Sequence, residues 1–255
     1  MMAPTATTLD VQARPVQRAL GRSAIYRLLS LACAYPTDDR IRVLREEALP
    51  PALIGAEALG RGLKARLDAL ASLLPSLELE KVRDHYHRTF GHVSVPDCPA
   101  YESAYMGTNL FQHVHRMADV AGFYRAFGFT VSDAHRERVD HLTMELEFMH
   151  VLTFKEAYAL VHHGRDKVSV CRRAQRKFWR EHLGRWLPAF VQLLAAKAAG
   201  GFYGELAQVL SACVQAEAKV LGDAPQLGPS KPDAQAPADS LECPWTDEGC
   251  PMVPS

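Results

Sequence analysis

The sequence predicts an all-α protein, a single-domain bundle of helices with a disordered C-terminal tail. Apolar residues recur at helical spacing, as in the stripe formed by Leu20, Ala24, Leu28, Leu31 and Tyr35. No stretch shows the regular polar–apolar alternation that is typical of a strand. A chain of 255 residues with 48% hydrophobic content can bury a substantial core.

Helix-breaking residues divide the chain into successive helices. Pro36 ends the first helix, and Thr37 or Asp38 is suited to cap the next. Gly200-Gly201 indicates a helix end and a restart, while the proline-containing stretch 91–100 is expected to form a loop. Further helices are expected over residues 57–74, 78–90, 109–127, 139–163, 166–182, 187–199 and 202–221.

The composition changes twice along the chain, which predicts three segments. Residues 1–15 are expected to be a flexible N-terminus, and residues 16–222 to be the helical domain. Residues 223–255 are rich in proline and poor in large apolar side chains, so they cannot offset their ordering entropy by burial. We therefore expect this last segment to be a mobile tail.

Charge and hydropathy limit the partners that the chain can have. Lys plus Arg and Asp plus Glu both number 29, so no net charge attracts nucleic acid or an anionic membrane to the whole chain. Residues 1–14 lack the apolar run of a secretory signal, and the apolar stretch 186–202 is too short and too polar to cross a bilayer. We expect a cytoplasmic protein without stable membrane insertion.

The six cysteines are scattered and include no Cys-x-x-Cys pair. Cys33 and Cys213 lie in apolar helical surroundings, so they are expected to be core thiols. Cys243 and Cys250 flank Trp245 and two acids in the tail, but two ligands do not complete a zinc site. The sequence gives no reason to expect a bound cofactor or metal.

The most informative segment is residues 138–149, Arg-Val-Asp-His-Leu-Thr-Met-Glu-Leu-Glu-Phe-Met. Its apolar residues follow a helical period and predict one buried stripe. Asp140 and His141 are expected at the entrance of this helix, off the stripe. His141 precedes Glu145 by one turn, which is close enough for the two side chains to pair.

This segment resembles the Asp-His-Leu and Glu-Leu-Glu-Phe-Met signature of the TorD/DmsD/NarJ family of molybdoenzyme chaperones. The stretches 98–105 and 117–128 resemble the family's proline-rich loop and the helix before the signature, and the three segments occur in the family's order. The similarity extends from about Ala19 to about Leu221. The chain departs from the family at Val139, where many members carry proline, and this leaves the preceding turn less rigid.

The resemblance implies a TorD-like helical bundle and a cytoplasmic maturation chaperone rather than an enzyme. In the family, the residues matching Asp140 and His141 contribute to binding the client's leader peptide. The expected partner is the precursor of a molybdoenzyme catalytic subunit, held until molybdenum cofactor insertion and then assembled or exported. The stretch 105–112 and the cysteine-containing tail favour the group that serves type II dimethyl sulfoxide reductase family enzymes.

Nearby side chains complete a candidate client-binding set. Tyr101 and Tyr105 follow Pro99 in the loop, and tyrosine offers an apolar face with a hydrogen-bonding tip. Glu102 and Glu145, like Asp140, can each bind a guanidinium of a twin-arginine leader in a bidentate pair. With His141, these residues are the predicted site.

A different class of function starts from Glu147 and His150. A Glu-x-x-His pair on a helix is typical of a helical di-iron site, but such a site needs a second pair. The nearest candidate is the stretch Asp84–His87, which supplies Asp in place of Glu. Serine-hydrolase, phosphate-loop and dinucleotide-binding motifs are missing from the sequence, so no catalytic residue is assigned. A homodimer is left open.

Overall fold

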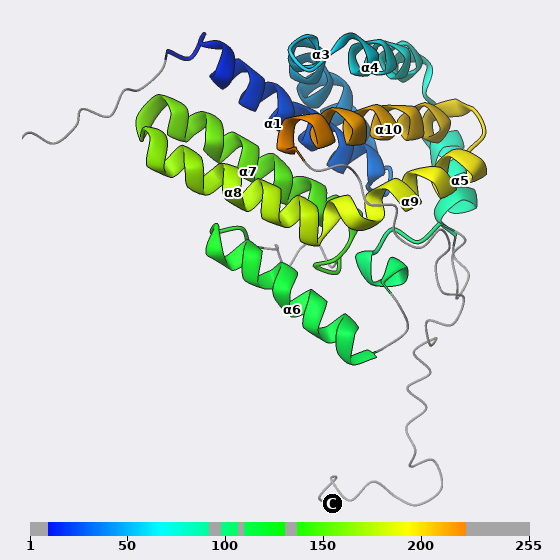
Figure 1. Cartoon of the computed structure of the whole chain (residues 1–255). Helices are drawn as coiled ribbons and strands as arrows, with labels where there is room; N and C mark the ends of the chain where they lie inside the picture. The colour runs from blue at the N-terminus through cyan, green and yellow to red at the C-terminus, as the bar shows by residue number, and fades with distance from the viewer. Residues whose placement is uncertain (1–9, 92–97, 107–109, 131–136, 223–255) are drawn as a thin grey trace, which may run out of the picture.

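The computed structural model describes residues 10–91, 98–106, 110–130 and 137–222, and every regular element in these ranges is helical (Figure 1). The prediction of an all-α fold is therefore confirmed. The longer helices are α1 (Arg14–Cys33), α4 (Arg61–Leu73), α5 (Leu79–Phe90), α6 (Leu110–Ala126), α7 (Leu142–His162), α8 (Arg165–Glu181), α9 (Leu183–Lys197) and α10 (Gly201–Leu221). Shorter elements are α2 (Asp38–Val43), the π-helical turn η1 (Leu44–Ala48), α3 (Leu49–Glu57) and the 3₁₀ turns η2 (Leu74–Ser76) and η3 (Glu102–Tyr105).

Several predicted helix ends have a direct physical explanation. The Thr37 side chain accepts a hydrogen bond from the backbone N–H of Arg40, so Thr37 caps α2 as predicted. Helix α9 starts at Leu183, four residues earlier than expected, and contains Pro188 in a buried turn. The C-terminal segment predicted to be a mobile tail and most of the loop predicted over 91–100 lie outside the described residues.

The helix expected after the Thr37 cap was predicted without an end, and the stretch from Asp38 to Glu57 forms three short elements, α2, η1 and α3. Each of these elements is short, so its hydrophobic period is difficult to recognise. Pro50 and Pro51 lie in the first turn of α3, where proline is tolerated because the backbone N–H groups there have no helical partner. The two prolines thus begin a helix rather than end one.

Helix α1 forms the centre of the core. On one side it runs antiparallel to α7, since Ser23 contacts His150 and the Ser30 hydroxyl donates to the carbonyl of Thr143 at 2.9 Å. On another side its backbone touches α3: a Cβ added at Gly21 would lie 2.7 Å from the Cα of Gly55. This close approach requires glycine in both helices.

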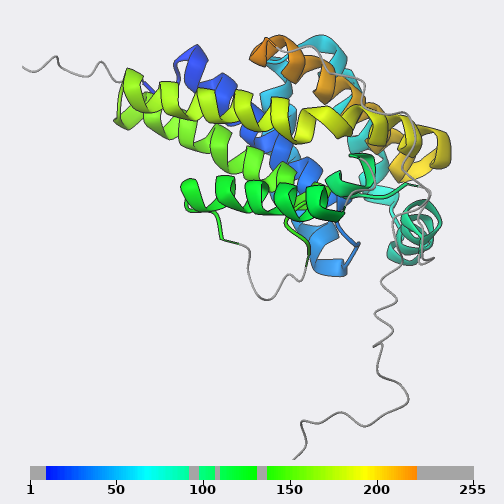
Figure 2. The same ribbon diagram turned by 60° about the horizontal axis from the view of Figure 1, so that its bottom comes forward.

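Helices α4 and α9 pack against α10, and α6 lies beside the α7–α8 pair (Figures 1 and 2). Aromatic rings pack α6 against the bundle: the ring centres of Phe123 and Phe178 lie 5.4 Å apart, and those of Tyr124 and Phe148 lie 4.8 Å apart. The core thiols Cys33 and Cys213 are buried, as predicted. None of the described helices combines the length and the apolarity needed to span a bilayer.

Candidate functional site

Two segments that are distant in the sequence meet at the N-terminus of α7. Tyr101 and His141 form an antiparallel bridge, flanked by backbone hydrogen bonds from Glu102 N–H to the Asp140 carbonyl (3.0 Å) and from Leu142 N–H to the Ala100 carbonyl (2.8 Å). The pairing fixes η3 against the entrance of α7. The predicted site residues are therefore brought into one region.

The Asp140 carboxylate is bound within the chain. It is 1% exposed and accepts hydrogen bonds from Arg138 Nε and Nη2, each at 3.0 Å, and from the backbone N–H of Ser103 at 3.2 Å. Arg138 also donates to the Ser103 hydroxyl at 2.9 Å and lies 4.8 Å from the centre of the Tyr101 ring. One bidentate ion pair thus joins η3 to the turn before α7.

His141 caps α7 instead of pairing with Glu145. Its Nδ1 accepts from the backbone N–H of Thr143 at 3.3 Å and is hydrogen-bonded to the Thr143 hydroxyl at 2.6 Å. The other ring nitrogen lies 3.9 Å from a carboxylate oxygen of Glu137. Burial lowers the pKa of His141, which favours the neutral imidazole that can accept the capping bond. The expected pairing with Glu145 is therefore wrong, because the cap occupies the ring.

Glu145 and Glu102 are both completely buried, and the two carboxyl groups are close enough for the charge of Glu102 to act on Glu145. Glu145 accepts a hydrogen bond from the indole N–H of Trp186 at 3.1 Å. Burial, followed by the neighbouring Glu102 carboxylate, raises the pKa of Glu145 well above its usual range. A neutral, protonated Glu145 suits this position, because two buried carboxylates cannot both ionise at low cost.

His182 connects Glu102 to the helix on the other side. Its Nδ1 lies 3.1 Å from Glu102, and its Nε2 lies 3.3 Å from Asp119 on α6. Arg138, His182 and Trp186 were not among the predicted site residues. Arg138 stood inside the signature segment, but no local pattern linked His182 to Glu102 or Trp186 to Glu145, because these contacts span 80 and 41 residues.

The two predicted tyrosines differ in accessibility. Tyr105 is 1% exposed, donates its hydroxyl to the Pro99 carbonyl at 2.8 Å and packs its ring against Trp186. Tyr101 is half-buried, with its ring edge against His141. Tyr101 is therefore the one predicted site residue that offers appreciable surface to a partner.

A groove of about 390 Å³ opens beside these residues. It lies between α1, α7 and the residues that connect α6 to α7, of which Phe129, Thr130 and Glu137 line it. Glu137 and Thr143, which both contact His141, belong to its lining. Leu31, Phe129 and Met144 supply apolar surface. The groove is thus continuous with the paired segments described above.

The acids that line this groove are accessible, unlike the predicted ones. Glu147 is exposed, and the Glu137 side chain is 45% exposed. Arg27 and Arg40 also line the groove: Arg27 pairs with Glu47 at 3.3 Å, while Arg40 donates to the Tyr35 carbonyl at 2.9 Å and keeps its charge. The groove therefore combines an apolar floor with carboxylates at its edge, a suitable surface for a basic, partly apolar peptide.

The geometry of His150 gives no support to the di-iron alternative. Its Nδ1 lies 2.8 Å from the Ser23 hydroxyl and 2.9 Å from the Ser23 carbonyl, so α1 engages the imidazole. Within the described ranges, no three His, Cys, Asp or Glu side chains converge as metal ligands. Glu147 and His150 have no second pair in that part of the chain.

Comparison with known proteins shows the family to which the chain is similar. Residues 56–192 match the family model described as nitrate reductase delta subunit. A perchlorate reductase assembly chaperone protein from Dechloromonas aromatica is 30% identical over 216 residues, covering 79% of this chain and 90% of that protein. A selenate reductase assembly chaperone protein from Thauera selenatis is 39% identical over 113 residues, or 44% of this chain and 56% of that one. The chaperone protein TorD from Photobacterium profundum is 28% identical over 121 residues, or 48% and 55% of the two chains.

Proposed function

This chain belongs to the TorD/NarJ family of molybdoenzyme assembly chaperones, and we propose that it captures the leader or N-terminal segment of a molybdoenzyme catalytic subunit in the cytoplasm. It holds that subunit until the molybdenum cofactor is inserted, and then releases it for assembly or export. The relatives named for perchlorate and selenate reductases support a client from the type II dimethyl sulfoxide reductase group.

One observation carries the proposal: the paired segments at the start of α7 border an open groove. The bridge between Tyr101 and His141 fixes one wall, and Thr143 and Glu137 continue that wall into the groove. A pre-formed wall reduces the entropy that the chaperone itself must lose when it captures a peptide. The structural role of the signature segment is therefore to build this wall.

The groove offers complementary chemistry to a twin-arginine leader. Leu31, Phe129 and Met144 receive the apolar part of the peptide. Glu137 and Glu147 bind its guanidinium groups, because their carboxylates are accessible at the edge. These two residues extend the predicted client-binding set.

The buried members of the predicted set act through their positions. Glu102, Tyr105 and Glu145 hold η3 against α7 and α9, so a partner reaches them only after rearrangement. Asp140 is different, because the guanidinium paired with it belongs to Arg138, whose side chain is 48% exposed. A leader arginine can take the place of Arg138 on the Asp140 carboxylate by exchange of like groups.

Calorimetric titration with a synthetic twin-arginine leader peptide tests the proposal. We expect saturable binding to the wild-type protein, and a loss of about tenfold in affinity in the Glu137→Gln/Glu147→Gln variant, which removes two charge-assisted contacts. The same peptide with both arginines changed to glutamine should bind equally weakly to wild type and variant.

A matched control is Glu57→Gln/Asp166→Asn, which removes two exposed acids, one at the end of α3 and one in the first turn of α8, neither of which lines the groove. This variant should bind the leader as tightly as wild type. If the leader and the full client precursor both fail to bind wild type, leader capture is wrong. If binding occurs but is equally strong in the groove and control variants, the groove assignment is wrong.

A further inference from the structure

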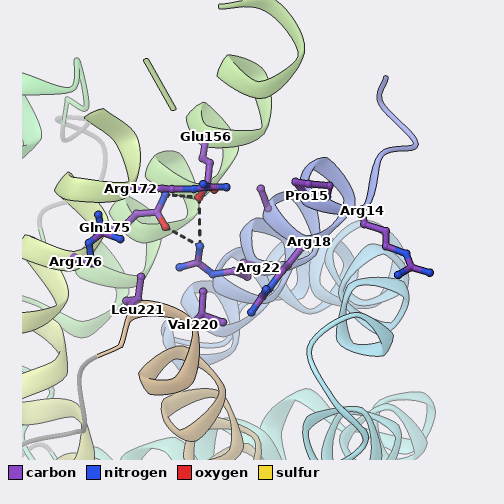
Figure 3. A pocket seen from close by; sticks show the side chains of 11 residues that line it. Arg14, Pro15, Arg18, Arg22, Glu156, Arg172, Gln175, Arg176, Val220 and Leu221 are labelled. Atoms are coloured by element: carbon purple, nitrogen blue, oxygen red, sulfur yellow. Dashed lines mark hydrogen bonds and ion pairs between the residues drawn. The ribbon is translucent and has the colours of Figure 1, made fainter. Parts of the chain in front are cut away.

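A second cavity, of about 430 Å³, lies at the other end of the α1–α7 pair (Figure 3). Five arginines line it, three from α1 and two from α8: Arg14, Arg18, Arg22, Arg172 and Arg176. Among the described residues that line it, Glu156 is the only acid, and Pro15, Val220 and Leu221 add apolar surface. We call this cavity the arginine pocket.

The charged side chains at the floor of the arginine pocket pair with one another. Arg22 makes a bidentate pair with Glu217 through bonds of 2.7 and 2.6 Å, and it donates to Gln175 at 2.7 Å. Glu156 accepts from Arg172 at 2.6 Å and also pairs with Arg22. The two carboxylates near the floor are thus already bound by floor arginines.

The rim of the arginine pocket carries charge without compensation. Arg14, Arg18 and Arg176 are exposed, and none of them has an ion pair or a side-chain hydrogen bond with the described part of the chain. Arg14 and Arg18 are one helical turn apart, an arrangement of like charges that slightly destabilises a helix. Three free guanidinium groups around one cavity are suited to an anionic group.

The chain itself contains a segment of opposite charge. Residues 223–255 contain six acids and one lysine, so the equal totals of 29 acids and 29 bases hide a tail of net charge −5 and a remainder of +5. Four of these acids, Asp239, Glu242, Asp247 and Glu248, flank Trp245 in the sequence. This cluster combines negative charge with an aromatic ring, which matches a pocket of arginines and apolar side chains.

The tail joins the bundle at the wall of the pocket. Helix α10 ends at Leu221, which lines the cavity, and Gly222 turns the backbone in the left-handed conformation with φ 78° and ψ 15°. A random coil with as many residues as separate Leu221 from Asp239 would have a root-mean-square end-to-end distance of roughly 23 Å. The acidic cluster can therefore reach the pocket, and tethering gives it an effective concentration of about millimolar.

We propose that the acidic tail, through the segment from Asp239 to Glu248, docks into the arginine pocket of its own chain. Its carboxylates bind the guanidinium groups of Arg14, Arg18 and Arg176, and the Trp245 ring covers the apolar surface of Val220 and Leu221. The contact is an internal competitor that excludes other anions from the pocket. It does not depend on the proposed leader binding.

The test uses the full-length chain with a fluorophore on Cys243. The four other cysteines, apart from Cys250, are buried, so Cys250→Ser leaves Cys243 as the accessible thiol. Fluorophore anisotropy is then measured at about 0.02 M and about 0.5 M salt, since the longer screening length at low salt preserves the attraction. We expect high anisotropy at low salt and a loss of the excess at high salt.

Two variants with equal loss of charge make the test specific. Arg14→Gln/Arg18→Gln/Arg176→Gln should abolish the salt-dependent anisotropy, whereas Arg61→Gln/Arg66→Gln/Arg125→Gln, at exposed sites elsewhere, should preserve it. Circular dichroism checks that each variant is folded. Identical anisotropy in wild type and the pocket variant would overturn the proposal.

Binding of inorganic pyrophosphate to the arginine pocket provides a second, independent test of tail docking. If the tail occupies the pocket, neutralising Asp239, Glu242, Asp247 and Glu248 as amides should strengthen pyrophosphate binding severalfold, because the internal competitor is removed. Equal pyrophosphate affinity with the acidic and the neutralised tail would instead assign the pocket to an external anion and overturn tail docking.

Discussion

The two ends of the α1–α7 pair both bury charge, but they balance it in different ways. Near the arginine pocket, Glu156 and Glu217 are matched by the guanidinium of Arg22, which stays charged at any accessible pH. At the entrance of α7, Glu102 and Glu145 lie together and meet imidazole and indole groups. The first end is held by fixed ion pairs. The second also has cations, Arg138 beside Asp140 and Arg116 at 3.7 Å from Glu102, but the charge balance there depends on whether buried Glu145 holds a proton.

This difference predicts that substitution of Arg22 lowers the free energy of unfolding more than the other substitutions considered below. Arg22→Ala would leave Glu217 and Glu156 buried without their main cation, and we expect a loss of about 3–5 kcal/mol in the free energy of unfolding. Urea denaturation measures this loss. Arg27→Ala on the same helix removes a pair whose side chains are 43% and 47% exposed, so it should cost less than about 1 kcal/mol. Similar losses in the two variants would contradict the contrast.

At the entrance of α7, protonation of Glu145 should make the stability of the fold depend on pH. Because the pKa of Glu145 is raised in the folded state, its contribution to stability is complete below the unfolded value of about 4.5 and is lost as the pH rises through the folded pKa. Glu145→Gln removes this proton and retains an acceptor for Trp186. The variant should therefore gain stability relative to wild type between pH 5 and pH 8, by at most about 1.4 kcal/mol per pH unit.

Exposed Glu57→Gln is the control for this measurement, and its difference from wild type should stay flat over the same pH range. Chemical denaturation at a series of pH values gives both curves. A flat difference for Glu145→Gln as well would mean that Glu145 is ionised in the folded protein, and the proposed proton dependence would be lost.

Asp140 lies between these extremes, since its partner Arg138 is half-exposed. Asp140→Ala removes the bidentate pair and the acceptor for the Ser103 N–H, and we expect a loss of about 1–3 kcal/mol in the free energy of unfolding together with weaker leader binding. Asp140→Asn keeps an acceptor for Ser103 and should recover part of the stability but little of the binding. Recovery of both would exclude a role for the charge.

The sequence predicts the helices well and the environment of the site poorly, for physical reasons. Strong apolar periods fix α1 and α7, and the proline and glycine positions locate most helix ends. The burial of Asp140 and Glu145 was not foreseeable from their own segment, because the covering surface comes from η3 and α9, far along the chain. Equal charge totals likewise concealed the separation between body and tail, since a sum contains no information about position.

The smallest expected effect on stability comes from Arg138→Gln, and it tests the exchange that we propose at Asp140. Asp140 is buried, but the glutamine amide keeps an N–H donor for its carboxylate and the Ser103 N–H continues to bind it, so the loss of stability should be about 1 kcal/mol. The leader's arginine would no longer have to displace an internal guanidinium, and its affinity should rise, by up to about tenfold if the bound internal form dominates in the free protein. Calorimetric titration with the leader peptide measures this gain. A fall in affinity would show that Arg138 stays on Asp140 and helps to form the wall that the leader contacts, so exchange would be wrong while the groove itself would remain.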